Sequence, residues 1–128
     1  MFRDPVRTLT LVADWLPLAT EFGSAVGIAN ATMLSGWAKI ILGEFEAGLA
    51  ELRDGLGRWR STGSKFYGPV RLGRSVAAFI EAAEVEQGAA LLAEAFQVME
   101  STGERWYEAE LHRLQGVLLA TSSSSRLA

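Results

Sequence analysis

Residues 61–67 read Ser-Thr-Gly-Ser-Lys-Phe-Tyr and residues 101–107 read Ser-Thr-Gly-Glu-Arg-Trp-Tyr, so one tripeptide is followed twice by a pair of aromatic residues. The two copies lie 40 residues apart, and a step of 40 back from Gly63 reaches Gly23. Similar segments at a fixed offset are the signature of a repeat protein. We therefore predict that the chain consists of copies of one unit with a 40-residue period.

The similarity extends beyond these glycines. Residues 44–48, Glu-Phe-Glu-Ala-Gly, align with residues 84–88, Glu-Val-Glu-Gln-Gly, at the same offset. An apolar stripe with spacings of three, four and three, which places it on one face of a helix, keeps its register in three copies. Its members are Leu9, Val12, Leu16 and Ala19, then Leu49, Leu52, Leu56 and Trp59, then Ala89, Leu92, Phe96 and Met99. The repeating unit is therefore predicted to be helical.

Two kinds of break divide each unit into two helices. Gly23, Gly63 and Gly103 stand where a helix is expected to end, because the terminating residue often adopts a left-handed conformation that glycine tolerates. A second break falls at residues 43–44 and 83–84. No window alternates at period two, so no strand is expected. The predicted fold is all-α and made of antiparallel helix hairpins, with six helices near 5–21, 25–42, 45–61, 65–82, 85–101 and 105–120.

The domain organisation follows from the period. We expect one domain over residues 1–120, with units of about 1–23, 24–63, 64–103 and 104–120, the first and last being half repeats. Residues 121–128 contain four consecutive serines and little apolar surface to pack. We expect this tail to be disordered.

Small residues recur at fixed places in the repeat, where we expect them to admit the backbone of a neighbouring helix. The rows at offset 40 are Gly36, Val76 and Gly116, then Gly48 and Gly88, then Gly55 and Ala95. This arrangement resembles the tetratricopeptide repeat, in which small residues occur in the middle of the first helix and twice in the second. The resemblance implies an α-solenoid, in which successive hairpins stack. The usual period of that family is about 34 residues, so a period of 40 implies longer helices or turns.

A closer resemblance covers the last third of the chain. The run from Thr102 to Gly116, Thr-Gly-Glu-Arg-Trp-Tyr-Glu-Ala-Glu-Leu-His-Arg-Leu-Gln-Gly, resembles tetratricopeptide-like repeats near the end of bacterial predicted-ATPase regulators fused to nucleotide-cyclase or LuxR-type modules. Residues 43–49, followed by 59–63, resemble the preceding repeat of these proteins. The resemblance implies a sensing or partner-binding segment and no ATPase chemistry, since the chain has no Gly-x-x-x-x-Gly-Lys-Ser/Thr phosphate loop.

Composition excludes several classes of function. The 128 residues include no cysteine and one histidine, so thiol chemistry, disulfides and multi-histidine metal sites cannot be built. A net charge of −3 and a pI near 5.2 argue against a nucleic-acid partner. No secretory signal is recognisable, and the most apolar segment, 24–42, is short for a membrane span and contains polar residues. We expect a cytoplasmic, non-enzymatic protein with no catalytic, cofactor or metal site and no membrane partner.

The remaining prediction is that the chain binds a protein or peptide. In a tetratricopeptide-like superhelix the first helix of each repeat lines the concave surface, so its basic and aromatic side chains are candidates for contact with an acidic peptide. The candidate residues are Lys39, Phe66, Arg71, Arg74, Trp106, Glu110 and Arg113. The alternative for Glu110 and Arg113 is an ordinary exposed helix pair. On the same helix, Tyr107, Leu111, Leu114 and Leu118 follow at spacings of four, three and four, and we predict that they form a core stripe.

Two further hypotheses stay open from the sequence. One is a small-molecule effector sensor, which requires a pocket lined by Trp37, Trp106 or Tyr67. The other is homo-oligomerisation, because the first and last helices both carry many apolar residues that normally stack on a next unit.

Overall fold

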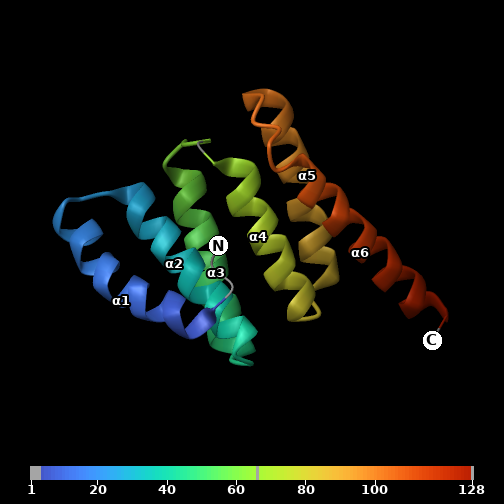
Figure 1. Ribbon diagram of the computed structural model, residues 1–128, viewed down its shortest axis with the longest axis horizontal. Coiled ribbons are helices and arrows are strands. Elements are labelled where there is room, and N and C mark those ends of the chain that lie inside the picture. Colours follow the sequence, from blue (N-terminus) through green and yellow to red (C-terminus); the bar gives the residue numbers. More distant parts are fainter. Residues whose placement is uncertain (1–3, 66, 128) are drawn as a thin grey trace. The chain divides into compact units, whose positions relative to one another are not determined.

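The computed structural model describes residues 4–65 and 67–127, the side chains of 122–127 excepted, and in these residues the expected all-α fold class is confirmed (Figure 1). No strand is found among the described residues. The six helices are α1 (Pro5–Glu21), α2 (Ala25–Ile41), α3 (Phe45–Ser61), α4 (Gly68–Glu81), α5 (Val85–Thr102) and α6 (Glu108–Leu127). The chain divides into two compact units, Met1–Ser64 (unit 1) and Lys65–Ala128 (unit 2). The stacking of hairpins into a solenoid stays a prediction.

The 40-residue period is visible in the backbone of the turns. Gly23, Gly63 and Gly103 all have a positive φ, at 67°, 72° and 75°. The second break repeats in the same way, since Gly43 has φ 91° and Ala83 has φ 61°. A left-handed residue after the end of a helix closes the turn by bonding back to the last carbonyls. Both classes of helix end predicted from the sequence are therefore confirmed.

The turn at Ala83 is the same motif as the turn at Gly43, although alanine is unfavourable there. The Gly43 N–H donates to the Ile40 carbonyl at 3.0 Å, and the Ala83 N–H donates to the Ile80 carbonyl at 3.0 Å. In both turns the next N–H completes a two-bond cap on the helix end. The side chain of Ala83 therefore carries a conformational cost that glycine would not.

Ala83→Gly is expected to raise the free energy of unfolding by about 0.5–1 kcal/mol, the steric cost of a left-handed alanine less the extra flexibility of glycine in the unfolded chain. Equilibrium urea unfolding of the two proteins measures the difference. Ala82→Gly is the matched control because Ala82 has φ −86°, so glycine there should only destabilise. A destabilised Ala83→Gly protein would contradict the turn.

In unit 1, α2 packs against both α1 and α3. Its contact with α3 is backbone to backbone: a Cβ built on Gly36 would lie 2.6 Å from the Leu52 nitrogen and 2.7 Å from the Gly48 oxygen. A Cβ on Gly48 would lie 2.8 Å from the Gly36 oxygen. Glycine is therefore required on both helices where they cross. On the other side of α2, Val12 of α1 packs with Ala31 and Leu34.

In unit 2, α4 packs against α5, and α6 packs against both. The α4 and α5 backbones are farther apart than those of α2 and α3, because a Cβ on Gly88 would meet its nearest atoms at 3.6 Å. The buried residues Leu111, Leu114 and Leu118 attach α6, as the core stripe predicted from the sequence requires. The repeat therefore keeps its helices and turns but not its interhelical spacing.

Two helix boundaries differ from expectation by three residues. A turn precedes both α4 and α6, closed by the Gly68 N–H on the Lys65 carbonyl at 2.9 Å and by the Glu108 N–H on the Arg105 carbonyl at 3.0 Å. Proline is favoured in the first turn of a helix, and Pro69 occupies this place in α4. Tyr67 thus precedes α4, and Trp106 and Tyr107 precede α6, instead of lying inside these helices.

The end of α6 also differs from expectation. The helix continues to Leu127, past residue 120, and the Thr121 hydroxyl donates to the Val117 carbonyl at 2.9 Å. Such back-bonding satisfies a hydroxyl inside a helix. The backbone of residues 121–127, expected to be disordered, is therefore helical, and residue 128 lies outside the described residues. No described helix has the length and apolar character required to span a membrane.

Candidate functional site

Unit 2 carries a group of aromatic and charged side chains, which we call the aromatic-arginine cluster. It is formed by the turn before α4, the first turns of α4, and the segment that leads into α6. Its members are Tyr67, Arg71, Arg74, Glu104, Trp106 and Tyr107, with Glu110 and Arg113 beside them on α6.

Trp106 is the centre of the aromatic part. Its ring centroid lies 5.8 Å from that of Tyr67 and 5.8 Å from that of Tyr107, with interplanar angles of 86° and 69°. These are edge-to-face contacts, which hold aromatic rings in a defined orientation. Trp106 is nevertheless 64% exposed. The indole is therefore a large apolar surface that is oriented by its neighbours and open to solvent.

The backbone of Tyr67 is strained. Its φ of 54° lies in the left-handed region, which is unusual for a bulky residue. Residues in such conformations cost on the order of 1–3 kcal/mol and persist only where the surrounding structure fixes them. The turn closed by Lys65 and Gly68 provides this constraint and directs Tyr67 toward Trp106.

The two arginines of α4 extend the cluster. The guanidinium carbon of Arg71 lies 6.0 Å from the centre of the Tyr67 ring, at the outer limit of a cation–π contact. Burial lowers the pKa of Arg71, and the nearby Glu104 carboxylate opposes this shift. Burial raises the pKa of Tyr107, whose hydroxyl is also hydrogen-bonded with Arg74. Two cations thus contact the two tyrosines that flank the exposed indole.

Glu110 and Arg113 form an ion pair on α6. The guanidinium contacts both carboxylate oxygens, with Nε to Oε2 at 2.9 Å and Nη2 to Oε1 at 2.5 Å. This hydrogen bonding from Arg113 lowers the pKa of Glu110 and raises that of Arg113. Both side chains are partly exposed, so the geometry is that of the ordinary exposed helix pair that the sequence left open.

We expect the pKa of Glu110, followed by carboxyl carbon chemical shifts, to lie below that of an ordinary glutamate. Because the folded pKa is depressed, the pair contributes to stability above the unfolded-state pKa, and the contribution is lost as the pH falls through the folded value. Arg113→Gln should return the Glu110 pKa toward its ordinary value, with Arg105→Gln as the control. An unchanged Glu110 titration in Arg113→Gln would contradict the ion pair.

The structure brings together five of the seven residues predicted to bind a partner, Arg71, Arg74, Trp106, Glu110 and Arg113, in unit 2. Lys39 belongs to unit 1, where its ammonium forms an ion pair with Glu51 of α3. Phe66 lies outside the described residues. Tyr67, Glu104 and Tyr107 were not among the residues predicted to bind a partner, although Tyr67 was named for an effector pocket.

Glu104 and Tyr107, which were assigned to no site from the sequence, differ in the signal that they give. Tyr107 was assigned to the apolar core stripe, but it is only half-buried and its ring also contacts Trp106. The neighbouring Trp106 in the sequence could have indicated that Tyr107 belongs to an aromatic cluster. Glu104 aligns with Ser24 and Ser64 in the other repeats. This change from serine to an acid is the only signal in the sequence that sets Glu104 apart.

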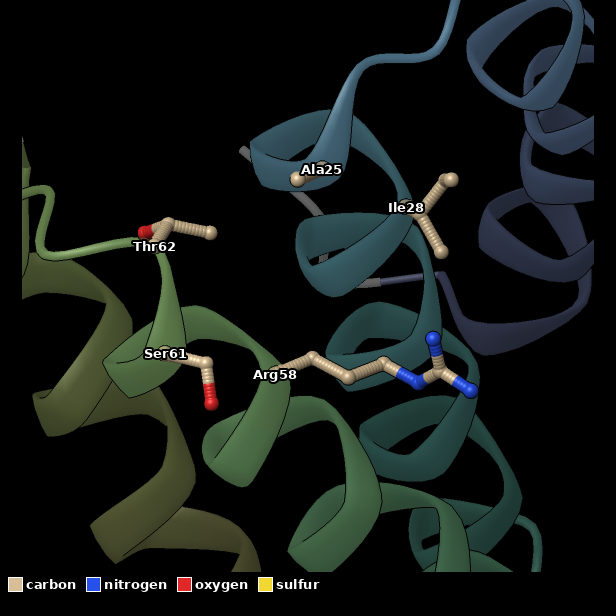
Figure 2. Close-up of a pocket in the computed structure, with 5 residues that line it drawn as sticks. All are labelled: Ala25, Ile28, Arg58, Ser61 and Thr62. Carbon is tan, nitrogen blue, oxygen red and sulfur yellow. The ribbon is translucent and has the colours of Figure 1, made fainter.

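Unit 1 contains a shallow pocket of about 300 Å³ between the start of α2 and the end of α3. Figure 2 shows Arg58 extending from α3 toward Ile28 of α2, with Ser61 at the end of α3, Thr62 just after it, and Ala25 opposite. The Arg58 Nε donates to Asp54 at 3.0 Å. The Ser61 and Thr62 hydroxyls donate to carbonyls of their own helix. None of the three tryptophan and tyrosine residues expected to line an effector pocket lies here.

Comparison with known proteins does not assign this chain to a family. No family model matches the sequence, and no match was found among curated proteins or among solved structures. Among the described residues, no group of three or more His, Asp or Glu side chains could hold a metal ion. The cluster combines an exposed, oriented indole with two arginines that contact the neighbouring tyrosines.

Proposed function

We propose that this chain is a non-enzymatic helical-repeat module that binds a protein or peptide partner through the aromatic-arginine cluster. The observation that carries the proposal is the exposed Trp106 held between Tyr67 and Tyr107, with Arg71 and Arg74 on the adjoining helix. Trp, Tyr and Arg are the residue types enriched in the hot spots of protein interfaces.

The pre-set orientation of the rings favours binding. Aromatic side chains lose little conformational entropy on contact, and rings already held in place by their neighbours lose less still. The strained backbone of Tyr67 supports the same interpretation, since such strain is found more often at functional sites than elsewhere. A peptide with an acidic residue beside an apolar side chain complements Arg71, Arg74 and Trp106.

The setting we propose is the sensor or scaffold region of a bacterial regulator, either as a fragment or as a relative. This part of the proposal rests on the resemblance of residues 102–116, and of residues 43–49 with 59–63, to tetratricopeptide-like regions of predicted-ATPase regulators. The cytoplasmic location expected from the sequence belongs to the same proposal.

Selection of displayed random 12-residue peptides on the full chain tests the binding function. We expect enriched peptides that combine Asp or Glu with an apolar residue. Trp106→Ala should weaken the binding of these peptides by about thirtyfold, the effect of a hot spot of about 2 kcal/mol. Phe45→Ala is the matched control, because Phe45 is also an exposed aromatic residue but belongs to unit 1. Equal binding of selected peptides to Trp106→Ala and the parent chain would contradict the proposal.

Small-molecule effector binding is the second candidate, and the unit 1 pocket is the observation that favours it. Its volume is at the lower end of the range typical of ligand sites. A thermal-shift screen of metabolites separates the two functions. Stabilisation that is lost in Arg58→Ala and kept in Trp106→Ala would favour an effector site in unit 1.

A further inference from the structure

Helix α1 has an exposed apolar stripe in addition to the face that packs on α2. Leu11, Trp15 and Leu18 follow one another at spacings of four and three, so they share one face of the helix. Their exposed fractions are 43%, 40% and 52%. The face toward α2 contains instead Val12 and Ala19, which are buried. We call the three exposed residues the α1 stripe.

The repeat shows what this face does in the other copies. The counterparts of the α1 stripe in α5, 80 residues later, are Leu91, Ala95 and Val98, all of which are buried in the unit where α5 packs on α4. In α3, the counterpart of Trp15 is Gly55, and a Cβ there would lie 2.8 Å from the Met33 nitrogen of α2. This face of the second helix of a hairpin is therefore the one that packs on the first helix.

Helix α6 shows the complementary situation. It is the counterpart of α2 and α4, the first helices of their hairpins. At Gly36 of α2 an added Cβ would collide with α3, whereas at Gly116, the same repeat position in α6, nothing lies within 4 Å. Leu119 on this part of α6 is 65% exposed. α6 thus presents to solvent the face that α2 gives to α3.

One pair of repeat positions has a member on each of the two exposed faces, the α1 stripe and the exposed face of α6. In unit 1 the pair is Lys39 and Glu51, which form an ion pair across α2 and α3. The corresponding residues of unit 2 are Phe79 and Leu91, which are apolar and buried. One more step of 40 from Phe79 gives Leu119, and one step back from Glu51 gives Leu11. The two leucines are therefore matched in polarity at positions that form an ion pair in unit 1 and are both buried in unit 2.

We propose that the α1 stripe of one copy of this chain docks on α6 of a second copy, head to tail, in the way that α3 docks on α2. The occupant is a second copy because the α1 stripe is the repeat equivalent of the α3 and α5 faces that pack on α2 and α4, and α6 is the repeat equivalent of α2 and α4. The two faces are different, so the contact leaves an open face at each end and association continues beyond the dimer. This self-association does not depend on the aromatic-arginine cluster.

Sedimentation velocity of the full chain between about 5 and 500 µM tests the proposal. We expect the average mass to rise with concentration and to pass the dimer. Leu11→Glu and Leu119→Lys should each raise the dissociation constant about tenfold or more, because each places an unpaired charge in the contact. Leu42→Glu, which changes another exposed leucine outside both faces, should leave association unchanged. A wild-type chain that is monomeric throughout this range would overturn the proposal.

The two variants also determine the orientation of the contact. Leu11→Glu keeps the α6 face and Leu119→Lys keeps the α1 stripe, so an equimolar mixture should associate more tightly than either variant does alone. The double variant should regain association that weakens with salt, because the introduced carboxylate and ammonium reproduce the ion pair of Glu51 and Lys39. Association through two identical faces would leave one single variant unaffected, and this result would also overturn the proposal. Unchanged circular dichroism shows that each variant is folded.

Discussion

Gly36→Ala is expected to lower the free energy of unfolding by about 2–3 kcal/mol, although alanine is the better helix former. The added methyl would lie 2.6 Å from the backbone nitrogen of Leu52 and 2.7 Å from the carbonyl oxygen of Gly48. Both are backbone atoms, so no side-chain rotation relieves the overlap. Helices α2 and α3 must therefore separate, and the contacts along their crossing are weakened.

Two other glycines provide matched controls for this substitution. Gly57 is on the open side of α3 with nothing within 4 Å, so Gly57→Ala should stabilise by about 0.5–1 kcal/mol. Gly88 is the repeat counterpart of Gly48, but its added Cβ would meet atoms only at 3.6 Å, so Gly88→Ala should be tolerated. Chemical denaturation of the three variants measures these changes. Equal effects of Gly36→Ala and Gly57→Ala would contradict the α2–α3 crossing.

The second large effect on stability is expected in the first turn of α6. Leu111 is fully buried and adjoins Gly73 of α4, so Leu111→Ala should destabilise by about 2–5 kcal/mol through lost burial and the cavity left behind. Leu119→Ala on the same helix removes the same atoms from an exposed site and should change stability by less than about 0.5 kcal/mol.

Thermal unfolding at low micromolar concentration measures both leucine variants while keeping association between chains small. Residues in the buried stripe of α6 attach it to α4 and α5, so loss of this attachment should also expose Tyr107 and change its near-ultraviolet signal. Similar stabilities of Leu111→Ala and Leu119→Ala would show that α6 packs in a different register.

The sequence predicted the helices and turns well because their signals are local. A left-handed glycine marks a helix end wherever it occurs, and the offset of 40 identified Ala83 as the counterpart of Gly43 even without glycine. The rows of small residues at offset 40 also predicted a close approach of two helices. The backbone contacts at Gly36 and Gly48 confirm this approach. The looser spacing at Gly88 could not be predicted, because it depends on how side chains of neighbouring helices fill the space.

The candidate site was predicted only in part for a related reason. Arg71, Arg74 and Trp106 could be identified from their residue types, but the aromatic pair was placed inside a helix. Pro69 and the turn from Lys65 to Gly68 instead delay the helix by three residues, which takes Tyr67 out of α4 and beside Trp106. The contribution of Glu104 arises from its approach to Arg71, a tertiary contact with no pattern in the chain.

One measurement tests most directly the central claim, that two 40-residue copies fold into helix hairpins with equivalent turns. Nuclear magnetic resonance of the full chain gives the sign of φ at residues 43 and 83 and the proton contacts between Gly36 and Gly48. We predict a positive φ at both Gly43 and Ala83, together with a direct Hα–Hα contact between Gly36 and Gly48. A negative φ at Ala83, or the absence of that glycine contact, would contradict the repeat as described.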